Sequence, residues 1–370
     1  MTTRLYACTS EKFVELHGVE GARRYLKMSD MGITIQKSLA TKVTLSSSDI
    51  IRTNGSLYLA TKENISDMEN EFRLLRAFGC NDIEWMSKEQ LADTPGCPAE
   101  FECGIFFPGD TIIDSEEYAR CLIRAAVSTG RVALYENSPP VVRTFTEGDI
   151  ALTELSTGAR IASKHVVMAT GGLLSESSLA GIMTPCWSYL VSLPHPSLST
   201  SQSNESPLPG GVPMDSPNMW TWGFAFDWCW TDGHLRVSGE DGHSAMKPPH
   251  AETRCQILEA WAKHQYSTVF DLSQMSHAST KSSDISYGVY SDIPDMLPLV
   301  GHPTRCSRIC YLLGCNAMGQ AVLSYAATLV PGLLGYGPTL SDEQYDMLSL
   351  LTIRRFQFLP VVANRKCRHI

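Results

Sequence analysis

Several familiar patterns are missing from this sequence, and each absence excludes a class of function. The 12 cysteines include no C-x-x-C pair, which disfavours a zinc module or a thioredoxin-like redox site. There is no clustered basic face, and the net charge of −9 argues against a nucleic-acid-binding protein. The first ten residues hold no apolar run and no cleavage motif, so the sequence predicts no signal peptide. We therefore expect a cytoplasmic protein with free, mostly buried thiols.

Two local clusters are given ordinary interpretations. Cys306, Cys310 and Cys315 lie close together in the sequence, with His302 just before them. Their spacing matches no common zinc pattern, so we expect no metal. The basic tail after residue 364 is expected to be a solvated end.

One long uncharged stretch needs a decision between two structures. No charged residue lies between Tyr311 and Ser341, so its length alone would allow a membrane span. Polar amides and glycines interrupt it, however, and amides are expensive in hydrocarbon. We predict a buried strand over Tyr311–Leu313, a glycine turn and a buried helix that ends near Pro331, and therefore no membrane association.

Periodicity predicts helices and strands along the rest of the chain. The expected helices are 11–39, 64–79, 115–128, 252–269 and 342–356, the third capped by Asp114 or Ser115 and ended by Gly130. The expected strands are 56–60, 105–107, 132–135, 141–142, 150–155, 160–161, 165–170, 185–193, 235–238 and 284–290. The apolar run 165–170, bounded by glycines, is typical of a parallel strand buried on both faces. A Ser/Pro/Gly-rich stretch, 197–218, predicts a surface loop.

Four segments, in order, resemble the D-amino-acid-oxidase-type (DAO) superfamily of FAD-dependent oxidoreductases. They are 107–126, with a P-G-D-x-x-I-D turn opening a helix; 135–141, similar to E-x-(S/T)-x-V; 166–172, similar to V-V-x-A-T-G-G; and 291–301 with 313–320, similar to T-P-D-x-L-P-x-I-G followed by G-x-N-G-x-G. Each segment alone is a weak signal, but their order over nearly the whole chain is specific.

The resemblance implies a fold, a cofactor and site residues. The fold class is α/β (α+β), with a Rossmann-like FAD-binding domain interleaved with a mixed-sheet substrate domain. The boundaries it implies are 1–44, 108–178 and 292–345 for the first, 45–107 and 179–291 for the second, and 346–370 for a C-terminal helix and tail. The cofactor-binding residues it implies are Val141, Thr170, Gly171, Gly172, Gly314, Asn316, Ala317, Met318, Gly319 and Gln320.

The last motif also has a physical rationale of its own. Gly314 and Gly319 bracket a turn where a strand feeds a helix, which leaves the first helical N–H groups free. These groups and the helix dipole favour an anion, such as the N1/O2 edge of a reduced flavin. The alternative is a glycine-assisted close packing of helix on strand.

A dinucleotide site also needs a strand, a G-x-G-x-x-G turn and a helix, and no such turn occurs in these 370 residues. The FAD-binding domain is therefore expected to be incomplete, without its first βαβ unit. Either the physical protein is longer, or the chain is a truncated, non-catalytic remnant that acts at most by binding a partner through an exposed sheet edge.

A second departure concerns the substrate, expected to be a small molecule. In amino-acid-oxidising relatives, an arginine before T-P-D grips the substrate carboxylate, whereas the matching residue here is Tyr290. The resemblance then favours oxidation of an amine over that of an amino acid, by hydride transfer to the flavin. Tyr290 is equally consistent with a core position. No side-chain acid or base is obligatory, so no catalytic residue is assigned.

Overall fold

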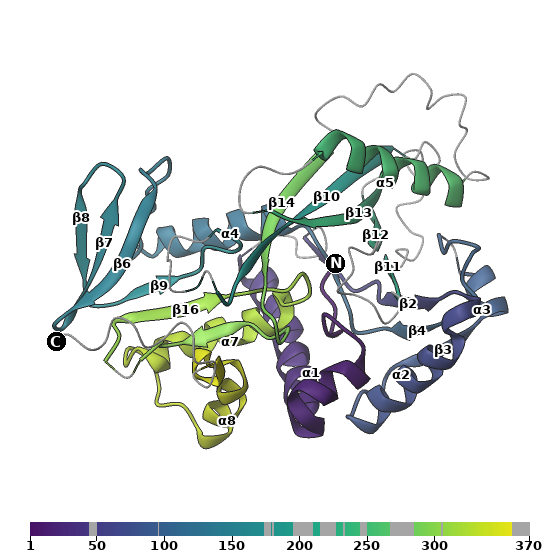
Figure 1. The fold of residues 1–370 in the computed structure, drawn as a ribbon, viewed down its shortest axis with the longest axis horizontal. Helices are drawn as coiled ribbons and strands as arrows, with labels where there is room; N and C mark the ends of the chain where they lie inside the picture. The colour runs from purple at the N-terminus through teal and green to yellow at the C-terminus, as the bar shows by residue number, and fades with distance from the viewer. Residues whose placement is uncertain are drawn as a thin grey trace.

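The structure is a computed structural model in which one large sheet and three smaller sheets are surrounded by helices (Figure 1). It describes residues 1–43, 50–94, 96–173, 179, 181–194, 210–214, 227–231, 234–244, 250–266, 285–304 and 306–356.

The large sheet has eight strands in the order β14-β10-β13-β12-β11-β2-β4-β3. It is antiparallel except where β11 runs parallel to β2. Its strands are β2 (Ser56–Ala60), β3 (Glu84–Ser87), β4 (Cys103–Phe107), β10 (Thr184–Pro194), β11 (Gly210–Pro213), β12 (Asp227–Thr231), β13 (His234–His243) and β14 (Ile285–Asp292).

Three smaller sheets complete the strand content of the described residues. The small sheet has the order β15-β16-β9, with β16 parallel to β9; a meander has the order β6-β7-β8; and β1 pairs with β5. Their strands are β1 (Ile51–Arg52), β5 (Ile112–Ile113), β6 (Val141–Glu147), β7 (Ile150–Leu155), β8 (Arg160–Ser163), β9 (Val166–Met168), β15 (Leu299–Gly301) and β16 (Ile309–Leu313).

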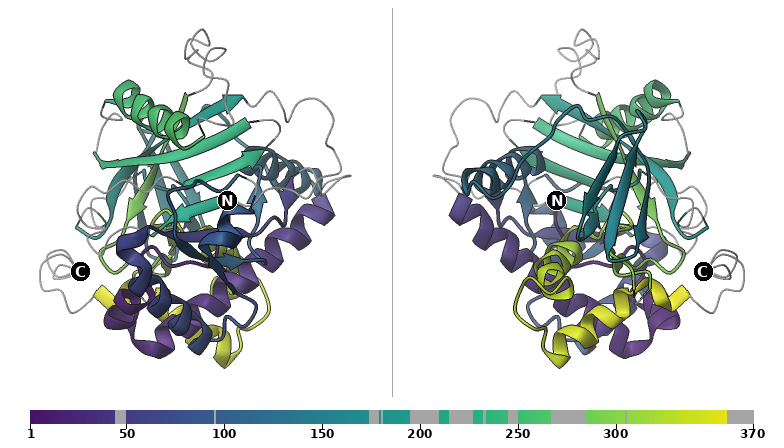
Figure 2. Two further views of the ribbon diagram at one scale, coloured as in Figure 1. Left: turned by 90° about the vertical axis from the view of Figure 1, so that its right-hand side faces the viewer. Right: turned by 90° about the vertical axis from the view of Figure 1, so that its left-hand side faces the viewer.

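Helices cover the sheets from opposite ends, with α5 at one end and α1 and α8 at the other (Figure 2). α5 packs on β10 and β13, while α1 packs mainly against α7. The helices are α1 (Ser10–Val43), α2 (Ile65–Ala77), α3 (Lys88–Ala92), α4 (Ser115–Ser128), α5 (Ala251–Gln265), α7 (Gln320–Leu333) and α8 (Asp342–Leu351), with short 3-10 turns η2 (Lys62–Asn64) and η5 (Ile353–Phe356).

Most of the expected elements form, and their ends follow local chemistry. Asp114 caps α4 by accepting a hydrogen bond from the Glu117 amide, as predicted, and Gly130 follows with φ 70°. α1 is broken at Gly18, where φ 71° and ψ 170° interrupt the helical path. The uncharged run divides into β16, a turn and α7, and every described helix is too short or too polar to cross a bilayer.

Three predictions of secondary structure are wrong. Residues 132–135 form no strand, and Leu134 and Tyr135 are 51% and 81% exposed. β9 is parallel, as expected, but it is not buried on both faces, because Val167 is 42% exposed. Within the expected loop 197–218, Gly210–Pro213 is strand β11 of the large sheet, and most of the remainder lies outside the described residues.

Candidate functional site

Two of the predicted glycine turns meet at one buried serine. Ser291 lies near the end of β14 and is fully buried. Its Oγ donates a hydrogen bond to the Gly171 carbonyl at 3.1 Å, and its own carbonyl accepts one from the Asn316 amide at 3.1 Å. The end of β9 and the turn after β16 therefore lie on either side of the same residue of the large sheet.

The turn after β16 is built from left-handed backbone. Gly314, Asn316 and Ala317 have φ values of 75°, 47° and 60°. Asn316 tolerates this conformation because its side chain bonds locally: Oδ1 accepts from the Ile293 amide at 2.6 Å, and Nδ2 donates to the Gly314 carbonyl at 2.9 Å. The turn is thus fastened to the segment that leaves β14.

The start of α7 has no side-chain cap. Gly319 is the N-cap residue, and a Cβ there would lie 2.5 Å from the Cys315 carbonyl oxygen. By helix geometry the amides of the first turn, beginning at Gln320, have no acceptor within the helix. The turn therefore presents N–H donors and the positive end of a 14-residue helix dipole. Ala317, just before this end, is exposed, and Met318 and Gln320 are half-buried.

The turn after β9 packs backbone against backbone. Thr170 and Leu173 close it, with the Leu173 amide donating to the Thr170 carbonyl at 3.1 Å and the Thr170 hydroxyl donating to the Leu173 carbonyl at 2.9 Å. Gly171 has φ 60°. A Cβ on Gly172 would lie 2.4 Å from the Tyr290 carbonyl oxygen, so only glycine permits this approach to β14.

Polar side chains gather at the neighbouring ends of β10, β13 and β14. The Tyr290 hydroxyl donates to Asp241 Oδ2 at 2.7 Å, and His243 Nε2 lies 2.6 Å from Asp292 Oδ2. Burial raises the pKa of Tyr290, and the nearby carboxylates of Asp241 and Asp292 raise it further. Burial also raises the pKa of Asp292, against the lowering effect of His243. Where the resemblance implied a substrate-binding arginine in relatives, this chain therefore has the neutral phenol of Tyr290, which is paired with the Asp241 carboxylate.

Three residues of this group escaped the sequence analysis: Cys186, Asp241 and His243. Cys186 is buried on β10, opposite both His243 and Tyr290 in the strand register. Only the pairing of the strands brings them together, because they are far apart in the chain. The one sequence signal for these three residues was that each lies near an end of its strand, β10 or β13.

Two aspartates of the recognised motifs have structural roles. Asp295, in the P-D turn, accepts two hydrogen bonds from Arg355, at 2.5 and 3.0 Å. Asp110, in the P-G-D turn, is fully buried and accepts from the Ser56 hydroxyl at 2.6 Å and the Arg4 amide at 3.3 Å. Both carboxylates are engaged in holding the fold together.

Val141 lies apart from the residues around Ser291. It begins β6, is 39% exposed and pairs with Leu155 in β7. The β6-β7-β8 meander projects to one side of the molecule, whereas β14 runs through its centre (Figure 1).

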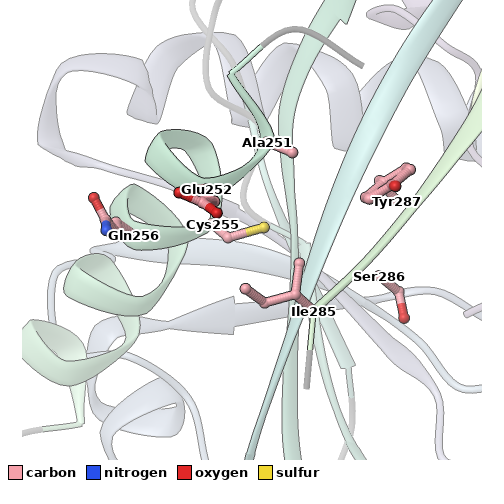
Figure 3. Close-up of a pocket in the computed structure, with 7 residues that line it drawn as sticks. All are labelled: Ala251, Glu252, Cys255, Gln256, Ile285, Ser286 and Tyr287. Atoms are coloured by element: carbon pink, nitrogen blue, oxygen red, sulfur yellow. The ribbon is translucent and has the colours of Figure 1, made fainter. Parts of the chain in front are cut away.

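A cavity of about 790 Å³ lies elsewhere, between α5 and β14 (Figure 3). It is lined by Ala251, Glu252, Cys255, Gln256, Ile285, Ser286 and Tyr287. Tyr287 is four residues from Ser291, about 14 Å along a strand. The polar pairs at the strand ends and the turn that leads to the uncapped start of α7 lie instead around Ser291.

Solved structures with the same fold are oxidoreductases. Glycine oxidase from Geobacillus kaustophilus is 19% identical, with a TM-score of 0.69 over 90% of this chain and 83% of that one. Iminodiacetate oxidase from Chelativorans sp. BNC1 is 18% identical, with a TM-score of 0.63 over 89% and 83%. L-proline dehydrogenase from P. horikoshii is 14% identical, with a TM-score of 0.59 over 83% and 79%. At these identities the likeness establishes the fold.

A comparison with curated protein sequences finds no match. The sequence profile of the FAD dependent oxidoreductase family, DAO, matches residues 19–330. This match covers most of the chain and includes both turns that meet at Ser291. The chain therefore belongs to the DAO family of FAD-dependent oxidoreductases, whose cofactor is FAD, as the sequence motifs predicted.

Proposed function

We propose that the chain is an FAD-dependent oxidoreductase that oxidises an amine substrate by hydride transfer to the flavin. The observation that carries this proposal is the junction at Ser291. It links the Gly171 turn to the uncapped start of α7 through two hydrogen bonds. In a family defined by FAD, such a junction offers backbone donors and little side-chain bulk to a flat ring.

The residues present fit the flavin end of FAD. The amides after Gly319 supply donors for the anionic edge of the ring, and Gly171, whose missing Cβ would meet nothing within 4 Å, leaves the backbone open to close approach. The residues that would line the ring are Gly314, Asn316, Ala317, Met318, Gly319 and Gln320, with Thr170, Gly171, Gly172 and Val141 along the rest of the cofactor. The described residues offer no G-x-G-x-x-G turn for the pyrophosphate. The fit therefore concerns the ring end.

When bound, FAD supplies the two-electron acceptor, and the protein has to position the substrate. The Tyr290 hydroxyl bonds to the Asp241 carboxylate at 2.7 Å, so this side of the site carries a negative group. The neighbouring cation, Arg254, is already bonded to the carbonyls of Glu240 and Asp241. A substrate ammonium group is attracted to such a surface, whereas a substrate carboxylate is repelled. This charge pattern favours an amine over an α-amino acid.

The division into two domains is part of the proposal. Residues 1–44, 108–178 and 292–345 would bind FAD, and 45–107 with 179–291 would bind the substrate. Ser291 and Asp292 then mark the boundary at which the two meet. The expected C-terminal helix ends at Leu351, the 3-10 turn η5 follows over Ile353–Phe356, and 357–370 lie outside the described residues.

Cofactor loading followed by anaerobic reduction tests the proposal. The purified chain is incubated with FAD and gel-filtered, and its visible absorbance is recorded before and after adding primary amines, secondary amines or α-amino acids. We expect retained flavin that is bleached by amines. Faster bleaching by α-amino acids would overturn the amine assignment, and retention of FAD without bleaching by any substrate would overturn the catalytic one.

A second function, that of a non-catalytic binding protein, is favoured by a different observation. Within the described residues β9 pairs with β16 alone, and Val167 is 42% exposed, as are Leu134 and Tyr135 at 51% and 81%. An open strand edge beside apolar side chains can pair with an added strand. Failure to retain FAD, in a chain that is folded by circular dichroism, would favour this function over the first.

A further inference from the structure

Three adjacent strands of the large sheet place a thiol, an imidazole and a carboxylate on one face. Cys186 of β10 lies directly opposite His243 of β13 and opposite Tyr290 of β14. Residues that are directly opposite share a face, with Cβ atoms about 5 Å apart, and Asp292 follows Tyr290 by two residues on that same face. The positions of these side chains are therefore set by strand register.

The three ligand-type atoms are close enough to share one ion. The Cys186 Sγ, one imidazole nitrogen of His243 and one carboxylate oxygen of Asp292 lie within 4.8 Å of one another. In a tetrahedral zinc site, ligand atoms about 2.0–2.3 Å from the metal are separated by roughly 3.5 Å. A separation at that upper limit must shrink by about 1 Å, and the 2.6 Å contact between His243 and Asp292 must open slightly. Changes of this size need only side-chain rotation.

We propose that Cys186, His243 and Asp292 bind a divalent transition-metal ion, with Zn²⁺ as the best match. A thiolate ligand disfavours Mg²⁺, Ca²⁺ and Mn²⁺, while a mixed S, N and O set suits zinc. One thiolate and one carboxylate also neutralise the two charges of the ion. Three protein ligands leave a fourth position for water.

The surroundings of the three residues suit a metal ion, because two of the ligands are open to solvent and the third has polar partners on its buried side. The side chains of His243 and Asp292 are 45% and 34% exposed, whereas Cys186 is buried. Behind the ligands, the Tyr290 hydroxyl bonds to the Asp241 carboxylate at 2.7 Å, and it also contacts the Cys186 thiol. Such outer partners orient metal ligands and are part of a metal site.

A nucleophilic Cys-His-Asp triad is a poorer account of the same residues. Reactive cysteines are partly exposed, whereas the Cys186 side chain is buried. The hydrogen-bond partners of this thiol include Tyr290 and Asp292. A bound metal ion, by contrast, deprotonates a coordinating thiol outright.

Cobalt substitution tests the proposal on the full chain, without reference to FAD or activity. The protein is treated with a chelator, desalted and titrated with Co²⁺ in an oxygen-free buffer. We expect one equivalent to bind, with a thiolate-to-cobalt charge-transfer band in the near ultraviolet and the visible bands of a tetrahedral ion. Added Zn²⁺ should displace the cobalt and remain with the protein on gel filtration, at one equivalent by elemental analysis.

Four variants decide where the ion binds. Cys186→Ser should abolish the charge-transfer band, and His243→Gln and Asp292→Asn should each weaken Co²⁺ binding at least about tenfold, in line with the loss of a ligand. Cys306→Ser is the matched control, because Cys306 is exposed and belongs to the other cysteine group. His243 is on the surface, so its variant tests the site even if Cys186→Ser fails to fold. The proposal is overturned if Co²⁺ gives no thiolate band, if His243→Gln binds as tightly as the parent, or if Cys306→Ser is the variant that loses the band.

Discussion

The middle strands of the large sheet and the edge strand β9 of the small sheet differ in how well they bury their apolar side chains. In the large sheet, Leu57, Leu59 and Tyr189 are 1% exposed or less. In the small sheet, Val167 of β9 is 42% exposed, and the apolar stretch 132–135 forms no strand. Strand β10 is paired on both sides, whereas β9 is paired within the described residues on one side. Pairing does not act alone, because the edge strand β15 is buried where α7 and α8 pack on it. A strand exists only where partners accept its hydrogen bonds and cover its side chains.

The largest expected effect comes from making the same substitution, leucine to alanine, once in the large sheet and once in the stretch 132–135. Leu59→Ala removes a fully buried side chain from the large sheet and should lower the free energy of unfolding by about 3–5 kcal/mol. Leu134→Ala, at a side chain that is 51% exposed, should lower it by less than about 1 kcal/mol. Urea unfolding followed by circular dichroism measures both. Equal losses would mean that stretch 132–135 is packed in solution, which would remove the contrast.

A buried carboxyl on the large-sheet side should make stability depend on pH. Glu71 of α2 is 2% exposed and accepts hydrogen bonds from the Ser10 amide and hydroxyl, at 2.8 and 2.7 Å. Burial raises the pKa of Glu71 to about 7, although the bonds from Ser10 oppose this rise. Its neutral form is thus favoured in the folded state. This preference contributes roughly 3 kcal/mol to the free energy of unfolding below about pH 4.5, and the contribution is lost as the pH rises through about 7.

The matched variant for this effect is Glu71→Gln, which can keep both bonds to Ser10 without titrating. Unfolding free energies measured from pH 4.5 to 7.5 should fall more steeply for the parent than for the variant. Parallel curves would show that Glu71 is not the titrating group.

The third effect lies at the junction of the two sheets. Gly172→Ala forces a Cβ to within 2.4 Å of the Tyr290 carbonyl oxygen, so the turn after β9 must move away from β14. Overpacking of this kind costs about 1–3 kcal/mol, and we expect FAD retention on gel filtration to be lost with it. Gly288→Ala is the control, because Gly288 lies on the same strand as Tyr290 and a Cβ there would meet nothing within 4 Å. Unchanged retention in Gly172→Ala would contradict the proposed cofactor position.

The smallest effect is expected at the open edge of the small sheet. Val167→Thr keeps the β-branched shape and exchanges one methyl group for a hydroxyl on an exposed strand. Stability should change by less than about 0.5 kcal/mol. A loss of more than about 1 kcal/mol by urea unfolding would show that this edge is covered in solution.

The sequence predicted the elements whose signals are local. The periodic helices, the Asp114 cap and the meander strands all form, because each depends on residues within one or two turns of itself. Residues 132–135 failed because a strand in a parallel sheet depends on distant partners. Strand β11 was missed because its Gly-Gly-Val-Pro sequence carries a loop signal and becomes a strand only beside β2.

The candidate site shows the same division between residues with a local sequence signal and residues that only the fold brings together. The family motifs led to Gly171, Asn316 and Tyr290, and the structure brings the first two together at Ser291. Cys186 and His243 could not be found in advance, since their meeting depends on the register of three strands.

The hydrogen bonds of Ser291 also constrain the order in which the molecule assembles. The partner of the Gly171 carbonyl is made 120 residues later in the chain, at the close of the last strand of the large sheet. Contacts between such distant residues form late and slowly, because a long loop must first be closed. The residues around Ser291 should therefore become ordered only after β14 has docked. A ligand that binds this junction in the folded state would stabilise the whole protein against unfolding.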